Sequence, residues 1–116
     1  MTPPTITSYR FGRIEIDGQV YTKDVIIMPD KVIANWWRGE GHALRPSDLE
    51  SVLEAAPATL IVGQGAFGRM QITDETRLVL EEAGIELLAA PTKEACERYG
   101  ELRERGNVAA ALHLTC

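Results

Sequence analysis

One glycine-rich segment has the spacing of a nucleotide-binding loop. Gly63-Gln64-Gly65-Ala66-Phe67-Gly68 matches G-x-G-x-x-G and follows a short β-rich stretch at residues 59–62. A dinucleotide site needs a helix to begin at this loop, because the free N–H groups and the helix dipole hold the pyrophosphate. Here residues 69–72 intervene and alternate like a strand. We interpret the segment as a tight structural loop at the carboxyl end of a strand. The alternative is a backbone nest for a smaller anion, with Arg69 near it.

Two histidines and two cysteines are the other residues that could support catalysis or bind a metal. A general base needs a partner that sets its tautomer, and the sequence has no recognisable Ser-His-Asp or Cys-His arrangement. His42 lies among loop glycines and is expected to be exposed. His113 lies in a predicted strand and is expected to be a hydrogen-bonded core residue. With Cys116 it makes only half of a metal site, and their spacing on a strand directs them to opposite faces. We predict no catalytic residue, no metal and no cofactor.

Residues 35–44 form a predicted loop with two adjacent tryptophans, in the order Asn-Trp-Trp-Arg-Gly-Glu-Gly-His-Ala-Leu. Adjacent side chains of an extended segment point to opposite sides, so one of Trp36 and Trp37 can pack inward while the other lies at the surface. Exposed Trp and Arg, here Arg38, are typical of protein interfaces. The alternative, in which both indoles cover the core beneath the loop, has equal support.

Two β hairpins are predicted in the first third of the chain. Residues 14–16 and 19–21 flank Asp17-Gly18, a pair preferred in type I′ turns. Residues 25–28 and 31–34 flank Pro29-Asp30, and Pro presets φ for a type I turn. The unbroken apolar run at residues 25–28 indicates a strand covered on both faces.

The second half of the chain alternates predicted helices and strands. Strands are expected at residues 59–62, 85–89 and 108–114. The helices are expected at residues 47–56, with Ser47 and Glu50 as a capping box, from Thr73 or Asp74 to Ala83, and from a Thr92 cap to Gly106. Strands joined by such helices imply right-handed crossovers and a parallel sheet. We predict a single α/β domain over residues 1–116, with a mixed sheet, N-terminal β hairpins and a C-terminal parallel β-α-β-α-β part.

The whole-chain composition argues against several classes of protein. A chain of 116 residues can form one domain without a metal or disulfide. The net charge of −5, from 12 basic and 17 acidic residues, argues against nucleic acid as a main partner. The longest apolar run, residues 108–112, is too short for membrane insertion, and the first ten residues lack the features of a secretion signal. Because the two cysteines make no disulfide framework, we expect a soluble, cytoplasmic protein.

Several motifs occur in a fixed order along nearly the whole chain. They are Ser8-Tyr9-Arg10-Phe11-Gly12, the loop from Trp37-Arg38 to Gly41-His42, Leu60-Ile61-Val62-Gly63-Gln64-Gly65, Thr92-x-x-Ala95-x-x-x-Tyr99 and the ending His113-Leu114-Thr115-Cys116. Together they resemble the Mth-type family of small uncharacterised domains, which includes the adipogenesis-associated Mth domain protein and a mitochondrial respiratory complex I assembly factor. The resemblance implies a compact three-layer α/β fold with no established catalytic activity.

The resemblance also implies which residues recur in the family. These are Asp24, His42, Gly63, Gly65 and Thr92, which we take as a candidate cleft. In many relatives Asn follows the tyrosine of the third helix, where this chain has Gly100. This chain therefore has no side chain at that position to make the ligand contact of the Asn.

Two hypotheses of function follow. The first is a non-catalytic binding or assembly-type domain, whose protein partner contacts the loop at Trp37 and Arg38; enzyme activity is left open but is not favoured. The alternative is a small anionic-ligand-binding protein or enzyme that uses residues 63–68 with Asp24, His42 and Thr92, because ligands bind beyond the carboxyl ends of parallel strands. Self-association through an exposed β edge is a third possibility.

Overall fold

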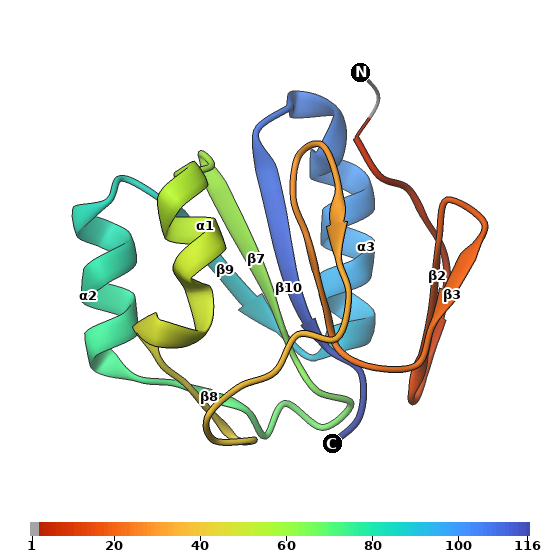
Figure 1. Cartoon of the computed structure of the whole chain (residues 1–116), viewed down its shortest axis with the longest axis horizontal. Coiled ribbons are helices and arrows are strands. Elements are labelled where there is room, and N and C mark those ends of the chain that lie inside the picture. Colours follow the sequence, from red (N-terminus) through yellow and green to blue (C-terminus); the bar gives the residue numbers. More distant parts are fainter. Residues whose placement is uncertain (1–2) are drawn as a thin grey trace.

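A five-stranded mixed sheet runs through the centre of the computed structural model, which describes residues 3–116 (Figure 1). β10 (Val108–His113) and β9 (Glu86–Ala90) both run parallel to β7 (Thr59–Gln64). β4 (Val25–Ile27) is antiparallel to β10, and β5 (Val32–Ile33) is antiparallel to β4. The predicted mixed sheet with a parallel C-terminal part is therefore confirmed. In spatial order the strands are β5, β4, β10, β7 and β9.

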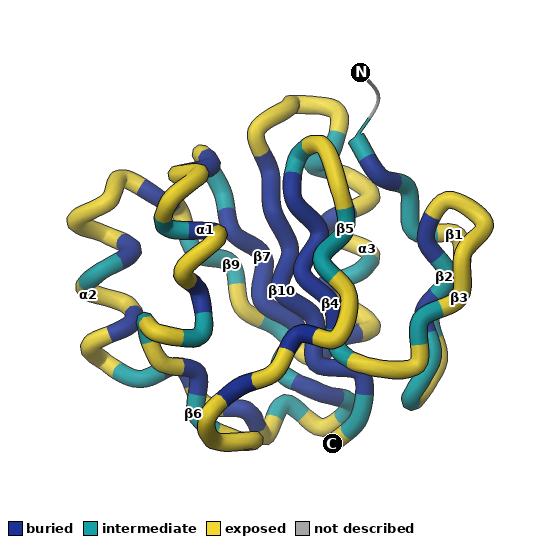
Figure 2. Tube along the Cα trace, in the orientation of Figure 1, coloured by how far each residue is buried: buried dark blue, intermediate teal, exposed yellow. Residues whose placement is uncertain are grey.

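Both faces of this sheet are covered. α1 (Glu50–Ala55) and α2 (Asp74–Glu82) lie on one face, and α3 (Thr92–Leu102) lies on the other (Figure 1). Successive residues of β10 enter the two cores alternately, as the period of a strand requires: Ala109 and Ala111 face α1 and α2, while Ala110 and Leu112 face α3. Figure 2 shows the central strands as the most deeply buried part of the chain. The result is the expected three-layer arrangement.

A small antiparallel sheet shares the α3 side of the molecule. It consists of β1 (Ile6–Arg10), β2 (Arg13–Ile16) and β3 (Gln19–Tyr21), and it packs Ile14 and Ile16 into the core. Asp17 and Gly18 both have positive φ, 50° and 82°, as a type I′ turn requires. Both predicted hairpins are confirmed: the first is the pair β2 and β3, and the second is the antiparallel pair β4 and β5 of the central sheet.

A pair of two-residue strands brings distant loops together. β6 (Ala43–Leu44) pairs in parallel with β8 (Gln71–Ile72), and the N–H of Gln71 donates to the carbonyl of His42 at 2.8 Å. The alternating segment after the glycine loop is therefore a short strand, as predicted. Through it, the tryptophan loop (residues 35–44) and the glycine loop (residues 63–68) lie at the same end of the central sheet, beyond the carboxyl ends of β7 and β10.

Two helix starts differ from the prediction. The first helical segment begins as a 3-10 turn, η1 (Pro46–Leu49), and Asp48 accepts a hydrogen bond from the N–H of Arg45 at 2.9 Å. Pro46, which favours the first position of a helix, moves this start ahead of the predicted Ser47 cap. Thr92 is the first residue of α3, and Pro91 occupies the capping position.

The other predicted helix boundaries are close to those observed. Thr73 caps α2, because its hydroxyl accepts from the N–H of Thr76 at 3.2 Å. A 3-10 turn, η2 (Arg103–Arg105), follows α3 and ends at Gly106. Within residues 3–116, no helix has the length and apolar character needed to span a bilayer.

Candidate functional site

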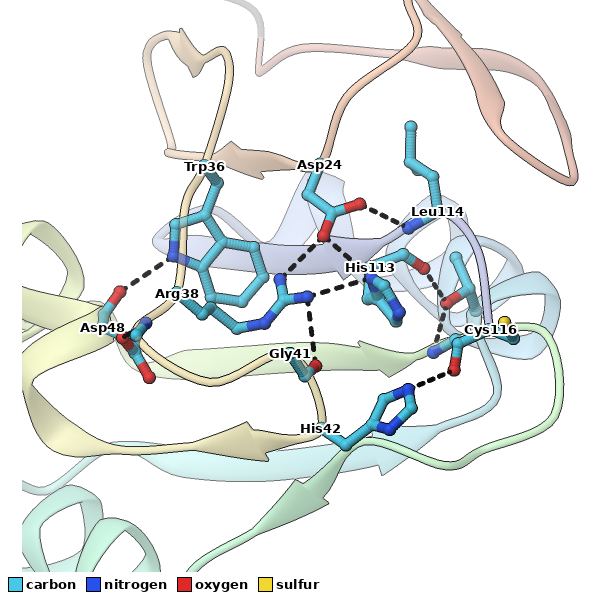
Figure 3. Close-up of polar contacts among 12 residues, drawn as sticks. Asp24, Trp36, Arg38, Gly41, His42, Asp48, His113, Leu114 and Cys116 are labelled. Carbon is cyan, nitrogen blue, oxygen red and sulfur yellow. Dashed lines mark hydrogen bonds and ion pairs between the residues drawn. The ribbon is translucent and has the colours of Figure 1, made fainter.

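Asp24, Arg38 and His113 form a charged cluster at the end of β10, in which Arg38 and His113 are buried and Asp24 is partly exposed (Figure 3). The Asp24 Oδ2 atom accepts hydrogen bonds from Arg38 Nη1 at 2.7 Å and from His113 Nδ1 at 2.8 Å. Its Oδ1 atom accepts from the N–H of Leu114 at 2.8 Å. Arg38 also donates from Nη2 to the carbonyl of Gly41 at 3.3 Å. One carboxylate thus joins the start of β4, the tryptophan loop and the end of β10.

Strand register brings Asp24 and His113 together from opposite ends of the sequence. β4 is antiparallel to β10, with Val25 opposite Leu112. Asp24 directly precedes Val25 and His113 directly follows Leu112, so the two side chains meet at the next position of the ladder. The apolar strands therefore position the charged pair.

The charge states in this cluster follow from burial and hydrogen bonding. Burial raises the pKa of Asp24, but the hydrogen bonds from His113, from the N–H of Leu114 and from Arg38 outweigh it, so this pKa lies below its ordinary value of 3.8. A charged carboxylate only accepts hydrogen bonds, so the contact with Asp24 assigns a proton to Nδ1 of His113. Arg38 Nη2 lies 3.0 Å from the same nitrogen and makes no hydrogen bond to it in that tautomer. Among the residues that the structure describes, His113 Nε2 and Arg38 Nε are buried without a hydrogen-bond partner.

The adjacent tryptophans point to opposite sides, as one of the two alternatives predicted. Trp36 is 8% exposed, and its indole N–H donates to the carbonyl of Asp48 at 2.9 Å. The guanidinium of Arg38 lies 4.7 Å from the centre of the Trp36 ring. Trp37, between these two buried residues, is 79% exposed. Arg38, which was expected at the surface with Trp37, is instead buried at 8% exposure because it pairs with Asp24. The loop therefore holds one large aromatic side chain in solvent on a fixed backbone.

A surface cleft of about 470 Å³ lies beside Trp37. The charge of Asp24 in its wall is compensated by Arg38, whereas Lys23 has no ion pair within residues 3–116. The cleft therefore combines an exposed indole, hydroxyl and amide groups and one uncompensated positive charge. Its lining residues are Thr22, Lys23, Asp24, Asn35, Trp36, Trp37 and Thr115.

Gly63, Gly65 and Thr92 meet at the same end of the sheet, where they pack closely and form what we call the seam. Thr92 Oγ1 donates to the carbonyl of His113 at 2.6 Å and accepts from the N–H of Gly65 at 2.9 Å, and the N–H of Thr92 donates to the carbonyl of Gly65 at 3.1 Å. A Cβ on Gly63 would lie only 2.9 Å from Thr92 Oγ1 and 3.0 Å from a methyl group of Leu112. Close packing therefore explains Gly63, and a φ of 93° explains Gly65.

His42 lies between the charged cluster and the seam. It is exposed, its Nε2 atom is 3.1 Å from the carbonyl oxygen of Cys116, and its ring centre is 6.4 Å from that of His113 (Figure 3). The structure thus gathers Asp24, Arg38 and His42 around His113. It turns Trp37 outward and closes Gly63, Gly65 and Thr92 onto one another.

Sequence reasoning missed part of this site. His113 is the hydrogen-bonded core residue that was predicted, but its pairing with Asp24 was not foreseen. The available signal was the position of each residue at the end of an apolar run, and its use requires the register of β4 against β10. Thr22, Lys23 and Asn35 of the cleft carry no local signal beyond being polar loop residues.

Comparison with known proteins gives the chain its family. Residues 6–113 match the family described as "Protein of unknown function (DUF498/DUF598)". The chain belongs to this family. A conserved hypothetical protein from Pyrococcus horikoshii is 29% identical, with 97% of this chain and 99% of that chain covered and a TM-score of 0.82.

Two further solved structures agree. The Rpa2829 protein from Rhodopseudomonas palustris is 28% identical (97% and 85% covered, TM-score 0.76). A Mth938-like domain from Bordetella pertussis is 22% identical (96% and 85% covered, TM-score 0.66). The Mth-type resemblance and the fold class are thereby confirmed.

In this member of the DUF498/DUF598 family, access limits the chemistry of the cluster. An Asp-His pair can act as a general base through Nε2, but here Nε2 of His113 is buried. Burial raises the pKa of the Cys96 thiol to about 12, so it is not a thiolate at neutral pH. No three His, Cys, Asp or Glu side chains within residues 3–116 are grouped to hold a metal ion. The arrangement is better suited to holding a loop than to transferring protons.

Proposed function

We propose that the chain is a non-catalytic, assembly-type binding domain that contacts a protein partner through Trp37. The exposure of Trp37 carries this proposal, because its neighbours Trp36 and Arg38 are both buried at 8% exposure. Large aromatic side chains are frequent anchors of interfaces. An anchor on a backbone that is already ordered loses little conformational freedom on binding.

The charged cluster supports this role by preorganising the loop. Arg38 reaches across to Asp24 and back to the carbonyl of Gly41, so it ties both sides of the loop to the sheet. The cleft beside Trp37 offers a place for a partner side chain, and Lys23 would favour a partner with negative charge there.

The Mth-type resemblance suggests the kind of partner. Because one relative in that family is a respiratory complex I assembly factor, we propose a component of a multi-protein assembly as the partner. The cytoplasmic location expected from the cysteine usage remains a prediction.

Affinity capture with quantitative mass spectrometry tests the proposal. We expect Trp37→Ala to reduce recovery of the partner by roughly tenfold or more, the size typical of an interface anchor. Leu78→Ala is the matched control, because Leu78 is a 54% exposed apolar residue on α2. Equal recovery of every bound protein by Trp37→Ala and by the parent would refute the proposal.

A small anionic ligand is the second candidate function. The buried unpartnered Nε–H group of Arg38 favours it, since this group could donate to an anionic acceptor if the loop opened. The N–H groups of Gly65 and Ala66 weigh against a site in the glycine loop, because they already donate to Thr92 Oγ1 and to the carbonyl of Thr115. Titration with phosphate, nucleotides and small carboxylates, followed by amide NMR, distinguishes the two. Saturable shifts of the amides at Arg38 and His113, or at Gly63, Gly65 and Thr92, would support the ligand, and silence at all of them would remove it.

A further inference from the structure

β9 is the least protected strand edge among residues 3–116. The other free edges are short or irregular: β5 has two residues, β3 has three, and β1 has a register shift between Ile6 and Ser8. β9 has five residues, Glu86–Ala90, in unbroken register with β7, and it contains neither Pro nor Lys. Natural proteins seldom leave a straight edge of this length uncovered.

The backbone N–H and C=O groups of alternate residues in β9 point sideways, away from β7 and toward the open edge. The N–H of Glu86 donates to the carbonyl of Ala58 at 2.9 Å, which shows which residues of β9 direct their backbone groups toward β7. In a parallel pair, alternate residues bond to the neighbouring strand, so Glu86, Leu88 and Ala90 face β7. Leu87 and Ala89 therefore offer their N–H and C=O groups to the open edge, and Ala89 is exposed there.

We propose that this edge binds β9 of a second copy of the chain, in antiparallel orientation, with Leu88 opposite the partner's Leu88. Leu87 then pairs with the partner's Ala89, and each such pair exchanges both backbone hydrogen bonds. Glu86 lies opposite the partner's Ala90 and at the far end of the ladder from the partner's Glu86. The five-stranded sheets of the two copies then join into one continuous sheet, related by a two-fold axis at Leu88.

Side chains of α3 make this arrangement complementary in charge. Glu94 and Arg98 line a groove of about 180 Å³ between β9 and α3, together with Leu88. α3 starts just beyond β9 and returns over the sheet. From Leu88 to Ala90 a strand advances about 7 Å. From Thr92 to Cys96 a helix advances about 6 Å.

Cys96 is therefore level with the axis at Leu88. Glu94 and Arg98 lie on either side of that level, so each Glu94 faces the partner's Arg98. Within the described residues Glu94 has no ion pair, and Arg98 has one long, exposed contact, from Nε to Glu101 Oε1 at 3.7 Å. A second copy thus supplies a further opposite charge at both positions, which is the reason for preferring it to an unrelated strand.

This interface is independent of the Trp37 surface. Trp37 follows β5, and β5 and β9 are the two opposite edges of the central sheet. Paired β9 strands would leave Trp37 free on each copy, so either proposal can fail without the other.

Sedimentation velocity over a range of concentrations tests the pairing. We expect the parent to form a dimer, and Ala89→Pro to raise its dissociation constant by roughly a hundredfold, because the lost N–H bond occurs twice in a two-fold interface. The ladder to β7 does not use this N–H, so the fold is retained, as circular dichroism would show. Val20→Pro on the edge strand β3 is the control and should dimerise like the parent. A parent that stays monomeric, or an Ala89→Pro variant that dimerises as strongly, would overturn the proposal.

Exchange of charges gives a test that does not alter the backbone. Glu94→Arg alone and Arg98→Glu alone place like charges opposite each other, and each should weaken the dimer by about tenfold. The double variant restores opposite charges and should return the dissociation constant to within about threefold of the parent. A double variant as weak as the single ones would count against this register of the two strands.

Discussion

The charged cluster and the seam lie at the same end of the sheet, and both contain residue types that suggest a functional site. Different forces hold the two regions together. In the charged cluster, the charges of Asp24 and Arg38 neutralise each other beside His113. In the seam, Gly63 allows Thr92 to approach β7 closely, and the Thr92 hydroxyl hydrogen-bonds to backbone atoms of Gly65 and His113. The cluster joins loops by electrostatics, and the seam joins a helix to a strand by close contact.

The two regions also differ in what they leave at the surface. The seam leaves nothing accessible, because Gly63, Gly65 and Thr92 are all buried. In the cluster Arg38 and His113 are buried too, but Asp24 is partly exposed and lines the cleft, and the loop that Arg38 holds keeps Trp37 in solvent. Residue types alone make the seam look more like a binding site than the cluster, and only the exposed surroundings reverse that order.

Removal of the Asp24 carboxylate should have the largest effect on stability. Asp24→Ala leaves Arg38 charged and buried without its partner, and it frees the N–H of Leu114. We expect a loss of about 3–5 kcal/mol in the free energy of unfolding, measured by urea denaturation. Glu40→Ala is the control, because it breaks an exposed ion pair with Arg45 and should cost less than about 1 kcal/mol. Similar losses in both variants would mean that the cluster is no stronger than a surface pair.

A methyl group in the seam should have the next largest effect. Gly63→Ala places a Cβ 2.9 Å from Thr92 Oγ1 and 3.2 Å from the backbone Cα of Thr92, so α3 must shift. We expect a loss of about 2 kcal/mol, by the same urea measurement. Gly41→Ala serves as control, since a Cβ there meets no atom within 4 Å and should change stability by less than about 1 kcal/mol. If Gly63→Ala is as stable as the parent, close packing does not explain this glycine.

The sequence predicts the features that depend on neighbouring residues. Asp17-Gly18 specifies its turn through local φ preferences, and the alternation of an extended chain separates Trp36 from Trp37. The Thr92 cap was wrong because groups distant in sequence occupy its hydroxyl: the oxygen accepts from the N–H of Gly65, and the hydrogen is donated to the carbonyl of His113. The charged cluster was not predicted because Asp24 meets His113 only through the register of two strands, and local patterns do not specify that register.

Acid should weaken the cluster and leave the seam unaffected. The pKa of Asp24 is lower in the folded protein than its ordinary value of 3.8, so the unfolded chain binds a proton at higher pH than the folded one. The stability due to this group is present above pH 3.8 and is lost as pH falls through the folded pKa. Urea unfolding over this acid range should show a shallower pH dependence for Asp24→Asn than for the parent. Thr92→Val is the control from the seam, and its pH dependence should equal that of the parent; equal slopes for Asp24→Asn and the parent would contradict the assignment.

The smallest effect should come from a glycine that neither region needs. Gly100 lies in α3, the helix that Thr92 anchors, and a Cβ at this position meets no atom within 4 Å. Because glycine in a helix interior costs conformational entropy, Gly100→Ala should stabilise the protein by about 0.5–1 kcal/mol. Gly84→Ala is the contrasting variant, since Gly84 ends α2 with a φ of 75° and should lose a similar amount. A stabilising Gly100→Ala beside a destabilising Gly63→Ala would show that packing, and not the presence of glycine as such, distinguishes the seam. A destabilising Gly100→Ala would instead indicate a contact on the outer face of α3.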